Sequence, residues 1–185
     1  MSGNHTVAAI DCGTNSIRLL IASAGSDGRL VEQARELELV RLGEGVDATG
    51  AFRPDALERT FAACRSFAAM VEQHDCGQVR FVATSAARDV SNRNAFFAGV
   101  RQALGVDAEV IDGTEEARLS FAGAMSGVQV SDEPVLVIDC GGGSTELVLG
   151  RGTGIDSQVS INIGSVRLRE RFLHDDPPTV EQMDA

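Results

Sequence analysis

Two short segments carry the residues best suited to chemistry, and they begin 128 residues apart, at positions 11 and 139. Residues 11–16 read Asp-Cys-Gly-Thr-Asn-Ser, and residues 139–146 read Asp-Cys-Gly-Gly-Gly-Ser-Thr-Glu. Each segment follows one apolar run and precedes another. The sequence therefore predicts two matching hairpins, in which a buried strand ends in a carboxylate, turns through a glycine-containing loop and returns as a second strand.

This layout suits the binding of an anion together with a cation. Glycines let backbone N–H groups converge on an anion without a Cβ in the way, and the hydroxyls of Ser16 and Ser144 add donors. An aspartate at the strand end would repel a phosphate unless a divalent cation lay between them. The pattern therefore predicts a phosphate clamp bridged by a metal ion.

The loops also allow two other interpretations. A single Asp-x-Gly-x-x-Ser is also typical of a tight turn in which the aspartate caps backbone amides. Its repetition at equivalent points of the chain favours the clamp and indicates an internal duplication. A dinucleotide-binding loop fits less well, because neither loop has the Gly-x-Gly-x-x-Gly spacing and strand-like residues follow both.

Apolar periodicity predicts the elements that position these loops. Strands and helices alternate after an initial three-stranded meander, which indicates a mostly parallel α/β sheet. The predicted strands are 7–10, 17–22, 30–42, 79–83, 108–111, 135–139, 146–149 and 155–161, and the predicted helices are 54–77, 89–104, 114–125 and 165–173.

The charge and composition exclude several classes of function. The chain has 16 basic residues, all arginine, against 27 acidic ones, a net charge of −11. Nucleic acids and anionic membranes bind basic faces, so neither is expected as a partner. No apolar run reaches the roughly 18 residues that a membrane span needs. Four cysteines without zinc or disulfide spacing, and no export signal, predict a cytoplasmic protein.

Three motifs, in this order, resemble the signatures of the exopolyphosphatase/guanosine pentaphosphatase (Ppx/GppA) family. They are the loop at 11–16, Glu-Glu-Ala-Arg at 115–118 and the loop at 139–146. The family is a branch of the actin, sugar-kinase and chaperone-ATPase superfamily. The resemblance implies an actin-like (ribonuclease H-like) mixed α/β sheet with helices on both faces. Its first domain would span residues 1–128, and residues 129–185 would be the incomplete start of a second, similar domain.

The resemblance also implies an activity. It is the Mg²⁺-dependent release of terminal orthophosphate from inorganic polyphosphate, and also the hydrolysis of guanosine pentaphosphate (pppGpp) to ppGpp. Glu116 matches the family's catalytic glutamate, which would orient and deprotonate the attacking water. Residues 113–116 taken alone also read as an ordinary helix start, with Thr114 as the cap and acids that favour the helix dipole. Glu115 is expected to be only a first-turn acid.

Further site residues follow from the same resemblance. Asp139 and Glu146 resemble the family's metal and water ligands, and Asp11 would complete an oxygen-rich site for Mg²⁺. Arg88, directly after a predicted strand, would bind phosphate with its guanidinium, although a surface arginine at a helix start is the alternative. The remaining phosphate-binding residues would be Thr14, Asn15, Ser16, Gly141, Gly142, Gly143, Ser144 and Thr145.

The length of the chain bears on its expected catalytic activity, because residues 129–185 would make up about half of a second actin-like domain. The chain is therefore expected to be a truncated form whose own activity is in doubt. An actin-like or sugar-kinase-like ATPase shares both hairpins and is one alternative. A non-catalytic module that binds polyphosphate or alarmones is another. An unfinished sheet edge favours self-association as a homodimer.

Overall fold

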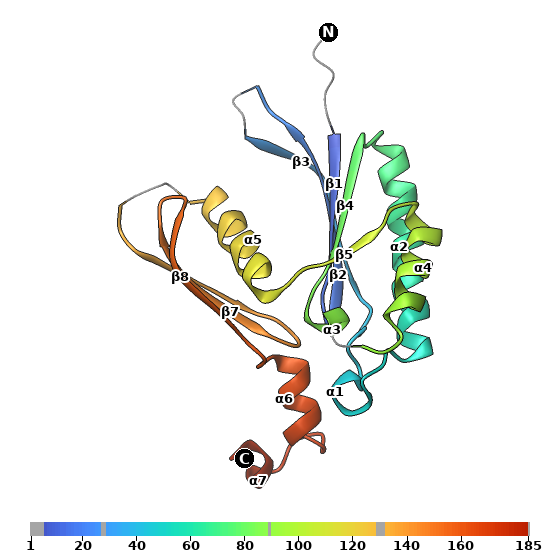
Figure 1. Ribbon diagram of the computed structural model, residues 1–185, viewed down its shortest axis with the longest axis vertical. Coiled ribbons are helices and arrows are strands. Elements are labelled where there is room, and N and C mark those ends of the chain that lie inside the picture. The colour runs from blue at the N-terminus through green and yellow to red at the C-terminus, as the bar shows by residue number, and fades with distance from the viewer. Residues whose placement is uncertain (1–5, 27–28, 89, 129–131, 185) are drawn as a thin grey trace. The chain divides into compact units, whose positions relative to one another are not determined.

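The computed structural model describes residues 6–26, 29–88, 90–128 and 132–184 (Figure 1). Residue contacts divide the chain into two compact units, Met1–Val110 and Ile111–Ala185.

The first unit is a five-stranded mixed sheet with helices on one face. Its elements are β1 (Thr6–Cys12), β2 (Ser16–Ala24), β3 (Leu30–Leu39), α1 (Val46–Thr49), α2 (Pro54–Gln73), β4 (Gln78–Ala83), α3 (Ser85–Arg88), α4 (Arg93–Leu104) and β5 (Ala108–Val110). The strand order is β3-β2-β1-β4-β5. The pairs β1–β2 and β2–β3 are antiparallel, whereas β1–β4 and β4–β5 are parallel. The predicted meander followed by parallel strands is therefore confirmed. The expectation of a mostly parallel sheet is wrong, because the meander contributes as many antiparallel pairs as there are parallel ones.

The core of this unit lies between the sheet and the helices α2 and α4. Alternate residues of β1 and β2, such as Ile10 and Ile17, are buried together with Phe67 of α2 and Phe96 of α4. Successive residues of a strand point to opposite faces. Asp11 therefore lies on the sheet face opposite to Ile10 and the core.

Helix α4 starts later than expected, at Arg93 instead of residue 89, which itself lies outside the described residues. Asn92 precedes the helix and ties it to the segment before α2. Its Oδ1 accepts from the Phe52 N–H at 2.9 Å, and its Nδ2 donates to the Phe52 carbonyl at 2.9 Å. This paired contact holds residue 92 outside the helix.

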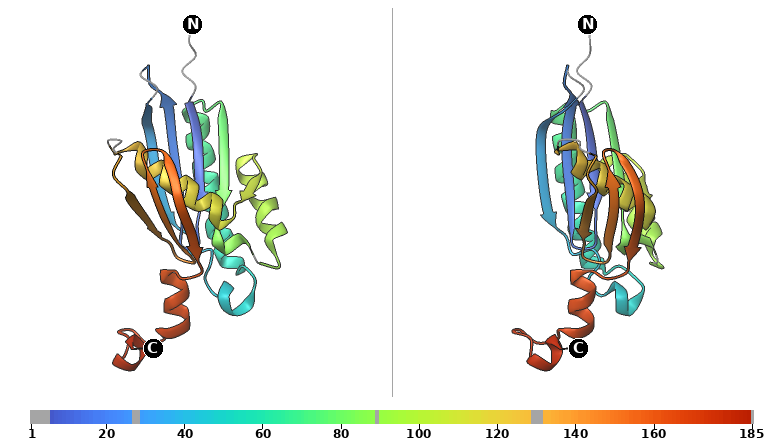
Figure 2. Two further views of the ribbon diagram at one scale, coloured as in Figure 1. Left: turned by 60° about the vertical axis from the view of Figure 1, so that its left-hand side comes forward. Right: turned by 90° about the vertical axis from the view of Figure 1, so that its left-hand side faces the viewer.

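The second unit is a three-stranded antiparallel sheet with helix α5 packed on one face (Figure 2). Its elements are α5 (Gly113–Ser126), β6 (Val135–Cys140), β7 (Thr145–Arg151), β8 (Gly154–Ile161), α6 (Ser165–Phe172) and α7 (Val180–Met183). The strands follow each other as in the meander β1–β3. Gly152, with φ of +56°, lies in the tight turn between β7 and β8.

The boundary between the units differs from the expected one. It was expected after α5, at residue 128, whereas the contacts place it before α5. Phe121 and Met125 of α5 are buried in one apolar cluster with Val148 of β7, which groups α5 with the second sheet. The assignment of the two units as related actin-like domains stays a prediction.

We considered membrane spans only among helices of the described residues. None of the helices found there combines the length and the apolar character needed to cross a bilayer.

Candidate functional site: two glycine loops and their acids

The two predicted loops have the same local geometry. In the first, Cys12 pairs with Ile17, and in the second, Cys140 pairs with Thr145. The Gly13 N–H donates to the Ser16 carbonyl at 2.9 Å, and the Gly141 N–H donates to the Ser144 carbonyl at 2.9 Å. We call residues 13–16 loop 1 and residues 141–144 loop 2. The two loops therefore close with the same hydrogen bond at positions 128 residues apart.

The carbonyl groups of loop 2 are bound by the start of α6. The Gly141 carbonyl accepts from the Ser165 N–H at 3.0 Å, and the Gly142 carbonyl accepts from the Val166 N–H at 2.9 Å. Arg167 donates its Nε–H to the Gly143 carbonyl at 3.0 Å. Within the described part of the chain, the N–H groups on the other side of the loop make no backbone hydrogen bond; these are Gly142, Gly143 and Ser144. Loop 2 thus presents donors and has its acceptors occupied.

Loop 1 repeats this arrangement with the segment that follows β3. The Thr14 carbonyl accepts from the Gly43 N–H at 2.8 Å, and the Asn15 carbonyl accepts from the Arg41 N–H at 2.9 Å. The Thr14 hydroxyl is hydrogen-bonded to Ser85 of α3 at 3.0 Å. Among the residues that the structure describes, the N–H groups of Thr14 and Asn15 donate no backbone bond. Unpaired amides of this kind are typical anion sites.

Two glycines that the sequence analysis did not single out make the close approach possible. A Cβ on Gly164 would overlap the backbone of Gly142 and Gly143, and a Cβ on Gly43 would overlap the side chain of Thr14. Both glycines follow the third strand of their meander. The hairpin β2–β3 is longer than β7–β8, so these glycines do not share the 128-residue offset that revealed the loops.

The acids of the second unit face each other across two strands. Asp139 of β6 is paired in register with Glu146 of β7, so both side chains lie on the sheet face that α5 covers. Glu146 is 1% exposed. Its Oε1 accepts from the Ser160 hydroxyl at 2.7 Å, while its Oε2 has no hydrogen-bond partner among the described residues. Like charges directly opposite on a sheet destabilise it, and a buried carboxylate is costly without a partner. These carboxylate oxygens are the kind of ligand that a hard divalent cation such as Mg²⁺ prefers.

Glu116, the predicted catalytic base, lies half-buried in the first turn of α5. The sequence predicted Thr114 as the cap of this helix, but the cap is Asp112. Its Oδ1 accepts from the Glu115 N–H at 2.8 Å. The Glu115 carboxylate is bound by the Arg118 guanidinium at 2.7 and 2.8 Å. Ser120 lies one turn after Glu116 on the same face of α5. Its hydroxyl donates to Asp139 Oδ2 at 2.5 Å. The structure therefore brings the predicted base and Asp139 to one side of α5.

The other predicted residues lie in the first unit. Asp11 is paired in register with Arg18, whose Nη1 lies 4.0 Å from Asp11 Oδ2. Arg88 is half-buried at the end of α3, directly after β4. Asp11 thus belongs to a different unit from Asp139 and Glu146. Over the described residues, no group of three or more His, Cys, Asp or Glu side chains gathers as a metal site. The three-acid metal set therefore stays a prediction.

The cysteines differ strongly in environment. Burial raises the pKa of the Cys64 thiol to about 12. Burial, and then the nearby Cys64 and Asp11, raise the pKa of the Cys12 thiol well above its usual value. Cys140, next to loop 2, is exposed. We therefore expect Cys140 to be the most reactive of these three.

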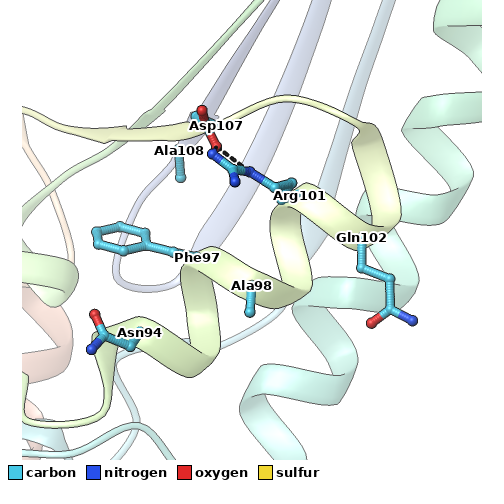
Figure 3. Close-up of a pocket in the computed structure, with 7 residues that line it drawn as sticks. All are labelled: Asn94, Phe97, Ala98, Arg101, Gln102, Asp107 and Ala108. Atoms are coloured by element: carbon cyan, nitrogen blue, oxygen red, sulfur yellow. Dashed lines mark hydrogen bonds and ion pairs between the residues drawn. The ribbon is translucent and has the colours of Figure 1, made fainter.

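A hollow of about 680 Å³ lies elsewhere on the first unit, along α4 and the start of β5 (Figure 3). It contains none of the predicted site residues. Its two charged groups, Arg101 and Asp107, form an ion pair with each other, with Arg101 Nε 2.6 Å from Asp107 Oδ1. Such a neutralised pair offers no excess charge to a phosphate, so we do not assign this hollow to the site.

Comparisons with known proteins decide the family. Residues 21–185 match the model of the Ppx/GppA phosphatase family. The chain belongs to this family. Exopolyphosphatase 2 of Mycobacterium tuberculosis is 52% identical over 96% of this chain. An exopolyphosphatase-like protein of known structure is 50% identical over 98% of this chain, with a TM-score of 0.92. The Ppx/GppA family member of Aquifex aeolicus is 34% identical over 97% of this chain, with a TM-score of 0.77.

These Ppx/GppA structures confirm the expected actin-like mixed α/β fold. The chain spans 58% of the length of the M. tuberculosis relative, 57% of the exopolyphosphatase-like structure and 58% of the A. aeolicus structure.

Proposed function

We propose that this chain binds inorganic polyphosphate and releases its terminal orthophosphate in a Mg²⁺-dependent hydrolysis. The observation that carries the proposal is the arrangement of loop 2. Its carbonyls accept from the start of α6, and the N–H groups of Gly142, Gly143 and Ser144 donate no backbone hydrogen bond within the described residues. Loop 1 repeats the arrangement. The likeness to a protein named Exopolyphosphatase 2 supports the choice of polyphosphate as substrate.

The phosphate is held by backbone amides and by one guanidinium. The N–H groups of both loops donate to phosphate oxygens, and the hydroxyls of Thr14, Ser16 and Ser144 and the amide side chain of Asn15 add polar contacts. The Thr145 hydroxyl donates to the Ile163 carbonyl at 2.6 Å, so its proton is engaged and Thr145 supports loop 2 from the side. Arg88 contributes a charge that can engage two oxygens at once. These contacts compensate the negative charge that the acidic chain otherwise presents to an anionic polymer.

The acids supply the metal ligands and the base. Asp139 and Glu146 hold the cation, and we propose Asp11 as a further ligand. When bound, Mg²⁺ neutralises charge on the phosphoryl oxygens and so favours attack on the phosphorus. Glu116 accepts a proton from the attacking water. Glu115 takes no part, because its carboxylate is engaged by Arg118.

Phosphate release by the purified 185-residue chain tests this proposal. The assay compares long-chain polyphosphate, pppGpp and ATP, each with Mg²⁺ and with excess EDTA. We expect orthophosphate from polyphosphate with Mg²⁺ and none with EDTA. Faster release from ATP would favour the ATPase alternative. Tight polyphosphate binding without release would favour a non-catalytic binding module.

We propose pppGpp as a second substrate, because it also ends in a terminal phosphoryl group that the same amides can bind. The rest of that molecule differs from a polyphosphate chain. We therefore expect the same loss with EDTA for both substrates but different KM values. An identical KM would mean that only the terminal phosphates are recognised.

Cys140 provides a reporter of phosphate binding at loop 2. With an anionic disulfide reagent, we expect bound polyphosphate to slow the modification of Cys140 about tenfold, because the bound polyanion repels the reagent. The measurement is the absorbance of the released thiolate, with Cys76→Ser removing the other accessible thiol. An unchanged rate at saturating polyphosphate would contradict binding at this loop.

A further inference from the structure

We infer that Ser120 and Ser160 are positioning residues, which orient the carboxylates of Asp139 and Glu146 for the cation and the attacking water. This inference rests on the proposed function. Ser120 donates to Asp139 Oδ2 at 2.5 Å, and Ser160 donates to Glu146 Oε1 at 2.7 Å. The two serines come from different elements, α5 and β8, and each engages one acid of the opposed pair.

The contact at Glu146 leaves one oxygen for chemistry. Ser160 is paired in register with Glu146 across β7 and β8, and the carboxylate is almost fully buried. With Oε1 held by the hydroxyl, the orientation of Oε2 is set, and Oε2 has no hydrogen-bond partner among the described residues. Gln158 lies on the same sheet face two residues earlier, and its buried Oε1 also has no partner there. Because buried polar atoms normally have a partner, we expect these two oxygens to bind a cation or to accept from a donor of a ligand.

The contact at Asp139 joins the acid to the helix that carries the base. Ser120 follows Glu116 by one helical turn, so both residues project from the same face of α5. Phe121 and Ala117 are buried on the neighbouring side of α5, where Phe121 packs with Val148. The hydrogen bond from Ser120 therefore fixes the rotation of α5 relative to β6, and with it the direction of the Glu116 side chain.

A hydroxyl suits this task better than a basic side chain. It holds one carboxylate oxygen without cancelling the charge, so the pair of acids keeps its negative charge for a cation. The equivalent pair of the first unit differs, because Arg18 faces Asp11 there. The second unit thus has two acids held by neutral donors, and the first has one acid beside a cationic group.

The test uses Ser120→Ala and Ser160→Ala in the full chain. Ser126→Ala is the control on α5, because its hydroxyl donates to the Gly123 carbonyl of its own helix at 2.7 Å. Ser157→Ala is the control on β8, where that serine is exposed. The readouts are kcat and KM for polyphosphate, and the Kd of Mn²⁺ alone measured by electron paramagnetic resonance. Chemical unfolding of every variant gives its stability.

We expect each test variant to lower kcat and to raise the Mn²⁺ Kd by about 10- to 100-fold, as for other residues that orient metal ligands. The KM for polyphosphate stays within twofold, because the loops are unchanged. Ser160→Thr, which retains the hydroxyl, restores most of the affinity. Mn²⁺ affinity and kcat equal to those of the controls in both alanine variants would overturn the inference. So would a loss of kcat and affinity that the unfolding curves fully account for.

A second readout separates this inference from the proposed function. In the ¹³C-labelled chain at one fixed pH, the carboxyl resonance of Glu146 is expected to shift in Ser160→Ala, and that of Asp139 in Ser120→Ala. Glu146→Gln and Asp139→Asn assign the two signals. Unshifted resonances would overturn the inference even if the wild-type chain is active. If the wild-type chain neither binds Mn²⁺ nor releases phosphate, the proposed function fails, and shifted resonances still support oriented carboxylates.

Discussion

Replacing Glu116 with Gln is expected to lower kcat for polyphosphate by about 10²- to 10⁴-fold, the usual contribution of a general base. The amide has nearly the same shape as the carboxylate but cannot take a proton from water. The phosphate-binding loops do not involve this side chain, so the Kd for tripolyphosphate should change less than about threefold. Phosphate release and isothermal calorimetry measure the two effects.

Glu115→Gln is the matched control. It makes the same chemical change one residue away, at a carboxylate engaged by the Arg118 guanidinium. We expect it to retain activity within about threefold, since that ion pair is exposed and contributes little. Turnover that survives in Glu116→Gln would require another base. A loss that is equal in both variants would point to damage of the α5 N-terminus instead.

Gly164→Ala is expected to have the largest effect on phosphate binding. The new Cβ would overlap backbone atoms of Gly142 and Gly143, which cannot move aside as a flexible side chain can. The start of α6 would then separate from loop 2, and the hydrogen bonds that occupy its carbonyls would lengthen. Forcing atoms into a packed site costs about 1–3 kcal/mol of stability. We expect a loss of this size in denaturant unfolding and at least a tenfold weaker Kd for tripolyphosphate, about 1.4 kcal/mol.

The same substitution at Gly123 is the control, because a Cβ there would meet nothing within 4 Å. Gly123 lies inside α5, so alanine should stabilise the helix by about 0.5–1 kcal/mol. Unchanged stability and unchanged phosphate affinity in Gly164→Ala would contradict this prediction. The close approach of α6 to loop 2 would then not be needed for phosphate binding.

The sequence alone predicted the two loops because their identity is local. A strand, an acid, glycines and a hydroxyl are contiguous, and their repetition after 128 residues separates them from ordinary turns. The closing hydrogen bonds at Gly13 and Gly141 agree with that prediction. The strand order of the first unit was also predictable, because a meander followed by alternating strands and helices allows few topologies.

The residues that support the loops were not predictable in this way. Gly43 and Gly164 matter through what lies beside them, and a glycine after a strand is common in sequences. Ser120 and Ser160 are partners of acids that lie 19 and 14 residues away in sequence, and a single serine on a helix or a strand has no distinctive pattern. Register and helix rotation bring these pairs together, and both are properties of the folded chain.

The boundary between the compact units is a further feature that sequence composition does not reveal. Val128–Pro134 is polar and contains a proline, which is typical of a linker. The division follows packing instead, since Phe121 is buried against Val148. Sequence composition cannot tell against which sheet an amphipathic helix buries its apolar face.

A crystal structure of the chain grown with Mn²⁺ and tripolyphosphate, with data at the manganese absorption edge, tests the central claim most directly. We predict phosphate density within hydrogen-bond distance of the N–H groups of Gly142, Gly143 and Ser144, and an anomalous peak coordinated by Asp139 and Glu146 Oε2. Phosphate bound away from loop 2, or manganese coordinated without either acid, would contradict the account.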